Sequence, residues 1–214
     1  IDPSKIIAPV MDLRWKDKKQ AKELFEKVGD RLGKSEKEVR KAWQSAIESQ
    51  REFEAACMEE GKKALAEIET EEKPAILVLG RPYNTCDSGI NLGLVMKIAE
   101  RGHTVIPLDF LPFDPAELGH EFRNIYWNYP QRIIHAMKKY RQHPRMYPVY
   151  FTNFSCGPDS FIETYSEHLS GEKPLLILGL DEHDADAGYI TRIEAFLDVV
   201  KNAERVTSFP EVAF

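Results

Sequence analysis

The larger part of the chain alternates short apolar runs with helical patterns, and this alternation limits its fold more than any other feature. The apolar runs, each typical of a buried strand, are Ala75-Ile76-Leu77-Val78-Leu79, Thr104-Val105-Ile106-Pro107-Leu108, Tyr147-Pro148-Val149-Tyr150-Phe151-Thr152 and Leu175-Leu176-Ile177-Leu178. Helical patterns follow at 90–101, 127–143, 159–169 and 189–203. Strict alternation predicts a parallel sheet with helices on both faces. We therefore expect an α/β domain over 73–205, with a four-stranded, doubly wound, flavodoxin-like sheet in the order 2-1-3-4, and a tail over 206–214.

The first third of the chain has helical periodicity instead. Ser35 and Glu38 stand at the spacing of a capping box, which predicts that a long helix begins there and covers about 36–69. Its apolar stripe includes Cys57, which we assign to the core. We expect residues 1–72 to form an α-helical arm ahead of the α/β domain.

Composition narrows the classes of function. The chain has 214 residues, of which 43% are hydrophobic, so we expect it to bury a hydrophobic core. Its net charge is -6, so we expect neither nucleic acid nor a membrane as partner. Three cysteines do not make a disulfide framework, and we expect a cytoplasmic protein. The chain begins Ile1-Asp2-Pro3 without an initiator methionine, so we expect a piece of a longer polypeptide.

Polar loops follow all four predicted strands. They begin at Gly80, Asp109, Asn153 and Asp181. In doubly wound sheets, ligands bind at the carboxyl ends of the strands, where the strand order reverses. The order 2-1-3-4 makes the first and third strands neighbours, so the loops that carry Cys86 and Cys156 should lie side by side.

Cys156 has the most informative position among the candidate site residues. It lies on a strand-to-helix turn, directly ahead of a predicted helix N-terminus, where the helix dipole and free N–H groups stabilise a thiolate. Such a thiolate can bind metal, attack an electrophile or carry out redox chemistry. Cys86 could be a second thiolate ligand, but two cysteines are too few for a complete iron–sulfur site.

The other loop residues leave several interpretations open. Arg81 could bind an anion or pair with Asp87 or Asp109. Its loop has neither the glycine spacing of a dinucleotide site nor the Gly-Lys-Ser/Thr of a P-loop. The acidic turn that contains His183 could bind a divalent cation, cap a helix, or supply a base to Cys156.

Four ordered segments resemble a known family. They are Gly80-Arg81-Pro82-Tyr83-Asn84 with Asp87 and Asn91; Asn128-Tyr129 with Gln131-Arg132; Asn153-Phe154-Ser155-Cys156-Gly157-Pro158-Asp159-Ser160; and Asp181-Glu182-His183 with Asp186-Ala187-Gly188. Together they resemble, over about 40–203, the carboxyl-terminal part of bacterial CoA-substrate-specific enzyme activases, the 2-hydroxyacyl-CoA dehydratase activase-related proteins.

The resemblance implies a function beyond what the spacing indicates. In that family, actin/Hsp70-like ATPase modules precede a dehydratase-like region, and ATP hydrolysis drives a low-potential electron onto an oxygen-sensitive iron–sulfur cluster. The chain has no ATPase motif, so the resemblance implies the dehydratase-like part only, from anaerobic bacteria, with an incomplete cluster or none in this piece. The site residues we assign are Cys156 and Cys86 as metal ligands; Arg81, Tyr83, Asn153, Gly157 and Ser160 as cofactor-binding residues; and Asn84, Asp159, Glu182 and His183 as catalytic residues.

Three hypotheses follow for the function. The first is a redox module that supplies Cys156 to an iron–sulfur cluster in an activase/dehydratase-like system. The second is a thiol-dependent enzyme with Cys156 as nucleophile and His183 as base. The third is a noncatalytic scaffold that docks onto a partner. The partners we expect are the preceding ATPase and dehydratase-like domains of the same polypeptide; an acyl-CoA and a second copy, in a homodimer, are further candidates.

Overall fold

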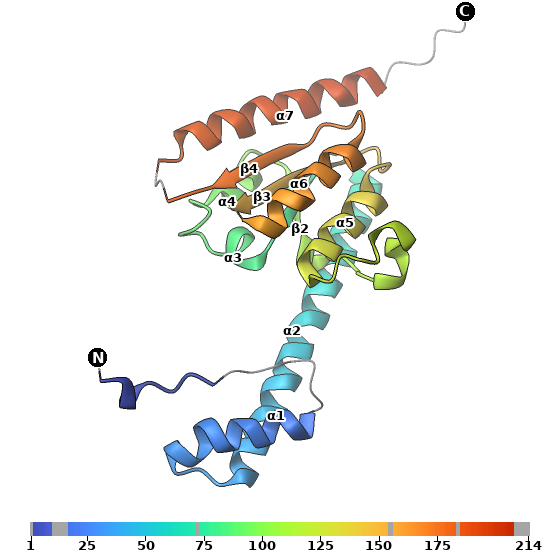
Figure 1. The fold of residues 1–214 in the computed structure, drawn as a ribbon. Helices are drawn as coiled ribbons and strands as arrows, with labels where there is room; N and C mark the ends of the chain where they lie inside the picture. Colours follow the sequence, from blue (N-terminus) through green and yellow to red (C-terminus); the bar gives the residue numbers. More distant parts are fainter. Residues whose placement is uncertain (1, 10–16, 72, 154–155, 183–184, 208–214) are drawn as a thin grey trace, which may run out of the picture. The chain divides into compact units, whose positions relative to one another are not determined.

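The computed structural model describes residues 2–9, 17–71, 73–153, 156–182 and 185–207. The chain divides into two compact units, Ile1–Ala56 and Cys57–Phe214, and each is described by itself (Figure 1). The sequence predicts a different boundary, after residue 72, between an arm over 1–72 and a domain over 73–205, and this stays a prediction. Among the described residues, no helix combines the length and the hydrophobicity that a membrane crossing needs.

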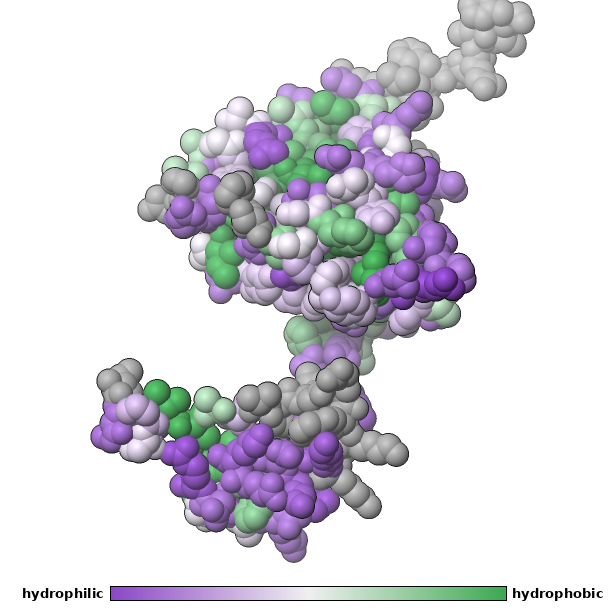
Figure 2. All heavy atoms as spheres, in the orientation of Figure 1, coloured by the Kyte–Doolittle hydropathy of each residue, from purple (hydrophilic) through white to green (hydrophobic). Residues whose placement is uncertain are grey.

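The first unit is helical and has a mostly hydrophilic visible surface (Figure 2). Its elements are η1 (Pro3–Lys5), α1 (Asp17–Leu24), the π-helical turn η2 (Phe25–Gly29), η3 (Asp30–Leu32) and the first part of α2 (Glu36–Glu71). The predicted capping box is confirmed: the Ser35 N–H donates to Glu38 Oε2 over 2.9 Å, and the Glu38 N–H donates to Ser35 Oγ over 3.3 Å. These two bonds satisfy free donors at the start of α2.

The second unit is built on a sheet of four parallel strands in the order β2-β1-β3-β4, as predicted. The strands are β1 (Ala75–Gly80), β2 (Thr104–Pro107), β3 (Met146–Asn153) and β4 (Leu176–Leu180). All six residues of β1 are buried, because this central strand has neighbours on both edges and helices on both faces. The apolar runs that predicted the strands are therefore the centre of the core.

Helices cover both faces of this sheet, as the doubly wound prediction requires (Figure 1). The helices are α3 (Pro82–Thr85), α4 (Leu94–Glu100), α5 (Asn128–Tyr140), α6 (Gly157–Ser170) and α7 (Ala187–Thr207), with η4 (Leu108–Phe110), η5 (Pro115–Leu118) and η6 (His120–Phe122) between β2 and α5. One apolar cluster joins the sheet to the end of α2, α5 and α6, and a second joins it to α4 and α7. The loops that leave the strands are thus supported from both faces.

The helix expected from Ile90 begins later, at Leu94. Asp87 Oδ1 accepts hydrogen bonds from the N–H groups of Gly89 and Ile90, at 2.8 and 3.1 Å, which favours a turn over a helix. Leu92 and Gly93 then have φ values of 53° and 67°. Two left-handed residues in succession interrupt a right-handed helix, and for leucine this conformation is strained.

Candidate functional site at the carboxyl edge of the sheet

The loops after β1 and β3 lie side by side because these strands are paired in parallel, with Gly80 opposite Phe151 at the end of the register. Residues between 69 and 78 positions apart in the sequence therefore meet at the carboxyl edge. The predicted neighbourhood of the first and third loops is confirmed by side-chain contacts between them: Arg81 contacts Cys156 and Asp159, and Asn84 contacts Asn153.

Arg81 is the centre of this site. Its Nη2 donates to Cys156 Sγ over 3.0 Å and to Asp159 Oδ1 over 2.8 Å, and its Nη1 donates to the Tyr83 hydroxyl over 2.6 Å. Burial lowers the pKa of Arg81, but the Asp159 charge and the bonds to Tyr83 and Cys156 raise it more. Arg81 is therefore a fixed cation beside the thiol, and its acidic partner is neither of the two aspartates expected from the sequence.

Asp159 sets the position of Arg81. The side chain of Asp159 is only 1% exposed, so its carboxylate depends on partners inside the protein. One oxygen pairs with Arg81, and the other accepts the Asn153 N–H over 3.4 Å. Asp159 thereby connects the end of β3 with the first turn of α6 and holds the guanidinium toward Cys156.

Cys156 is the N-cap residue of α6 and is half-buried. Its N–H donates to the Asn153 carbonyl over 3.1 Å, and its carbonyl accepts the Ser160 N–H over 2.9 Å. The sulfur therefore has both the helix N-terminus and the Arg81 cation beside it, and both favour negative charge there. Gly157 and Ser160 are exposed in the first turn of the same helix.

A chain of hydrogen-bonded asparagines connects the loops of the site. Asn84 is fully buried and donates from Nδ2 to Asn153 Oδ1 over 2.8 Å, while its carbonyl accepts from Asn91 Nδ2 over 3.0 Å. Asn91 Oδ1 accepts the Gly93 N–H over 3.0 Å, so this chain of bonds also reaches the left-handed turn. Asn84 thus connects two loops from a buried position rather than from the surface.

Cys86 belongs to a neighbouring cluster. It is exposed, and its sulfur lies 3.6 Å from Thr85 Oγ1. Nearby, the Tyr129 hydroxyl donates to Asp109 Oδ1 over 3.1 Å, and Arg132 lies 3.2 Å from the same oxygen. Burial, Asp109 and the proximity of Cys86 raise the pKa of Tyr129 to about 12. The two cysteine sulfurs thus have different neighbours along one edge, and both thiols are free.

The loop after β4 contacts α4, whereas the other site residues contact the loops after β1 and β3. Glu182 is exposed, and Asp186 pairs with Lys97 of α4 at 2.5 Å. His183, the predicted base for Cys156, lies outside the described residues, as do Asp184, Phe154 and Ser155. The roles assigned to His183 and Glu182 therefore stay predictions. Sequence reasoning missed the Arg81–Asp159 pair, although Arg81 stands directly after β1 and Asp159 lies in the first turn of the helix that follows β3, where such contacts form.

The donor set accommodates one ligand of an iron–sulfur cluster rather than a whole cluster. The described residues include no group of three or more histidine, cysteine, aspartate or glutamate side chains that could hold a metal ion. The Cys156 thiol has the electropositive setting of a metal-binding thiolate. A complete site of four cysteines would need ligands from elsewhere.

These features define a thiol site on a doubly wound α/β scaffold. The chain belongs to the family described as CoA enzyme activase uncharacterised domain, whose model matches residues 1–111. This membership confirms the predicted resemblance and gives the chain an activase-related role. The matched region includes Arg81 and Cys86 and ends before Cys156. Neither a curated protein nor a solved structure matches the chain.

Proposed function

We propose that the chain is a dehydratase-like module of an ATP-dependent CoA-substrate enzyme activase system, in which Cys156 is one ligand of an iron–sulfur cluster for low-potential electron transfer. The observation that carries the proposal is the 3.0 Å contact from Arg81 Nη2 to Cys156 Sγ at the start of α6. Membership in the activase family supports the same system.

The roles of this chain's residues follow from their contacts. Cys156 would be the ligand, and Arg81 would balance its negative charge and orient its sulfur. A bound cluster would supply one-electron chemistry, and hydrogen bonds to its sulfurs affect its reduction potential. Asp159 and Asn153 would fix Arg81 and the turn. Cys86 is a candidate second ligand, and Glu182 and His183 are candidate substrate-side groups.

The remaining ligands and the driving force would come from other parts of the system. The ATPase and dehydratase-like domains of a longer polypeptide are the proposed partners, and an acyl-CoA is the proposed substrate. A second copy, in a homodimer, is the other proposed source of ligands.

Anaerobic reconstitution with iron and sulfide tests this proposal, on the chain alone and on the chain extended upstream. Visible absorption and EPR should detect a cluster in the extended protein and its loss in Cys156→Ser. The control is Cys57→Ala, because Cys57 is buried on α2, and it should keep the cluster. An intact cluster in folded Cys156→Ser would refute the ligand assignment.

The Arg81 contact also suits a thiol-dependent enzyme, because a cation at sulfur activates a nucleophile. In that case, His183 would act as the base. Iodoacetamide should then alkylate Cys156 stoichiometrically near neutral pH, and His183→Ala should slow the reaction. Slow alkylation like that of Cys86, with no effect of His183→Ala, would exclude the thiol enzyme and leave the cluster assignment to its own test.

A further inference from the structure

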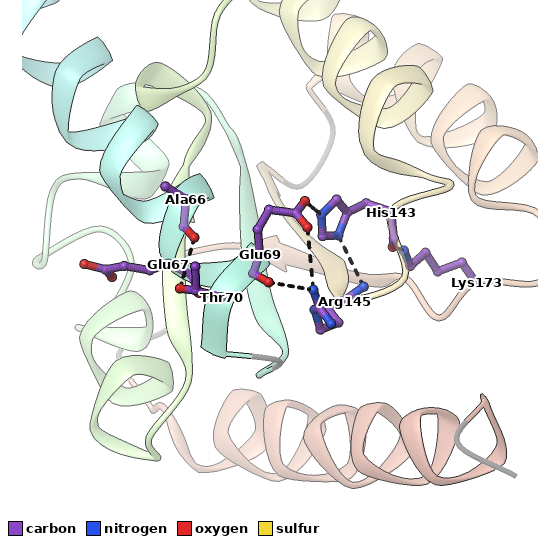
Figure 3. A network of polar contacts seen from close by, with 7 residues as sticks. All are labelled: Ala66, Glu67, Glu69, Thr70, His143, Arg145 and Lys173. Carbon is purple, nitrogen blue, oxygen red and sulfur yellow. Dashed lines mark hydrogen bonds and ion pairs between the residues drawn. The ribbon is translucent and has the colours of Figure 1, made fainter.

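A second cluster of polar side chains lies at the turn between α5 and β3, which is at the amino ends of the strands (Figure 3). His143 Nε2 lies 2.9 Å from Glu69 Oε1 of α2, and His143 Nδ1 accepts the Arg145 N–H over 3.3 Å. Arg145 Nη2 also lies 3.6 Å from Glu69 Oε2. Glu69 is thus already shared by two partners, and the His143 carbonyl faces away from them, toward Lys173.

Lys173 brings an amine to this cluster from the turn before β4. It is half-buried, its Nζ donates to the His143 carbonyl, and the nitrogen lies 5.1 Å from the centroid of the Tyr147 ring. Among the described residues, no carboxylate lies within salt-bridge distance of Nζ. A carbonyl and an aromatic face are therefore its polar surroundings.

A small, mostly apolar cavity of about 10 Å³ adjoins this amine. Leu77, Met137, Met146 and Ser170 line it together with Lys173. Its titratable lining residues are Tyr140 and Arg141, from the end of α5, and the ring of Tyr147 on β3 faces the Lys173 amine. None of these groups is an acid that would stabilise an ammonium at neutral pH.

An ammonium in such surroundings loses hydration without gaining a counter-ion, so the equilibrium shifts toward the neutral amine. Burial lowers the pKa of Lys173 to about 8. A neutral amine is the nucleophilic form of lysine. The side chain thus combines partial exposure, a fixed hydrogen bond and an uncompensated charge.

We propose that Lys173 is a site of covalent acylation by activated acyl groups, either thioesters or acyl phosphates. The Nζ lone pair forms a bond to the acyl carbonyl carbon, and the bond from that carbon to sulfur or to the phosphate oxygen breaks. The leaving group departs with the electron pair, and the proton lost from nitrogen passes to solvent. No electron donor or acceptor is needed.

The product suits this environment better than the ammonium does. A secondary amide keeps one N–H for the His143 carbonyl and removes the unpaired charge from the half-buried site. A lysine in a salt bridge would instead lose its partner on acylation. This inference does not depend on the proposed role of Cys156.

Site-resolved mass spectrometry of the full chain tests the proposal, with acetyl-CoA in one arm and acetyl phosphate in the other. The reference is Lys41, an exposed lysine on α2. At pH 7.5, Lys173 should react roughly tenfold faster than Lys41, because burial increases the neutral, nucleophilic fraction of the Lys173 amine. Its rate should level off above pH 8, as the Lys173 amine becomes fully neutral. The faster arm identifies the acyl source.

Equal or slower reaction of Lys173 in both arms, without the levelling, would overturn the proposal.

A matched pair of variants at the cavity wall adds a second test. Ser170→Asp introduces a carboxylate beside the amine and should slow acylation several-fold and move the levelling to higher pH, while Ser170→Ala should not. If both variants keep the native circular dichroism spectrum and react alike, the unpaired amine is not the cause and the inference fails.

Discussion

At the scale of single residues, the candidate site depends on Asp159. Its buried carboxylate has Arg81 as its charged partner, and the same guanidinium nitrogen reaches Cys156. Asp159 also contributes, after burial, to the raised pKa of the Tyr150 hydroxyl. Asp159 thus both positions the Arg81 cation at the thiol and raises the pKa of Tyr150.

Replacing Arg81 should therefore destabilise the protein as well as alter the site. Arg81→Met leaves Asp159 buried without its counter-ion, so we expect the free energy of unfolding to fall by about 3 kcal/mol. Urea unfolding followed by circular dichroism measures this change. The control, Arg40→Met, removes an exposed ion pair with Glu36 on α2 and should cost at most about 0.5 kcal/mol.

The double variant Arg81→Met with Asp159→Asn completes this test. The double variant should lose less unfolding free energy than the sum of the two single variants, because it leaves no buried charge unpaired. Equal losses for Arg81→Met and Arg40→Met would show that the pair contributes little and that Arg81 is not fixed by Asp159.

The sequence predicts which residues reach the site better than it predicts their pairing. Arg81 and Cys156 could be selected because they directly follow strands that alternate with helices. The Arg81–Asp159 pair could not, because Asp87 and Asp109 lie in equally suitable loops and only the three-dimensional packing decides among them. In the structure, Asp87 caps a turn and Asp109 binds Tyr129 and Arg132.

At the scale of elements, the short apolar runs predicted the strands correctly, whereas the local turn after β1 was not recognised. All four strands follow from continuous apolar runs, because a parallel strand buried on both faces needs them. The first turn expected of α4 was wrong, because the periodicity from Ile90 concealed the Asp87 turn and the left-handed Leu92. The four-residue helix α3 has too few residues for any periodicity.

The packing of the last turns of α2 within the second unit gives a prediction at this scale. Gly61 is buried, and a Cβ atom there would lie 1.8 Å from the Phe110 carbonyl oxygen. Gly61→Ala should therefore lower the free energy of unfolding by about 3 kcal/mol, since backbone has to move, although alanine favours a helix. Thermal unfolding measures the change.

Gly188→Ala is the matched control for that substitution. Gly188 lies exposed in the first turn of α7, with no atom within 4 Å of an added Cβ. Alanine there should raise the free energy of unfolding by up to about 1 kcal/mol, because helix propensity alone changes. If Gly61→Ala were also neutral or stabilising, the close approach of α2 to Phe110 would be refuted.

At the scale of the whole molecule, the boundary between units falls inside α2. The amphipathic pattern predicted α2 but not the position along α2 where its packing partners change, because its apolar stripe continues without a break. The apolar residues of its last turns belong to the core of the second unit: Ile68 is 2% exposed, and Ala64 and Leu65 pack beside it. A chain cut at the division between Ala56 and Cys57 should therefore differ in stability from a chain cut after residue 72.

Two truncated chains distinguish these divisions. A chain of residues 57–214 should unfold cooperatively in urea, because it retains the α2 turns that cover α5 and the sheet. A chain of residues 73–214 leaves the surface under Ile68 open to water and should be less stable by at least about 3 kcal/mol, from lost burial of that side chain and its neighbours. Amide hydrogen exchange should locate the lost protection in β1, α5 and η4, which contribute to the same apolar cluster. Equal stability of the two chains would instead support a domain that begins at residue 73, with α2 as a separable arm.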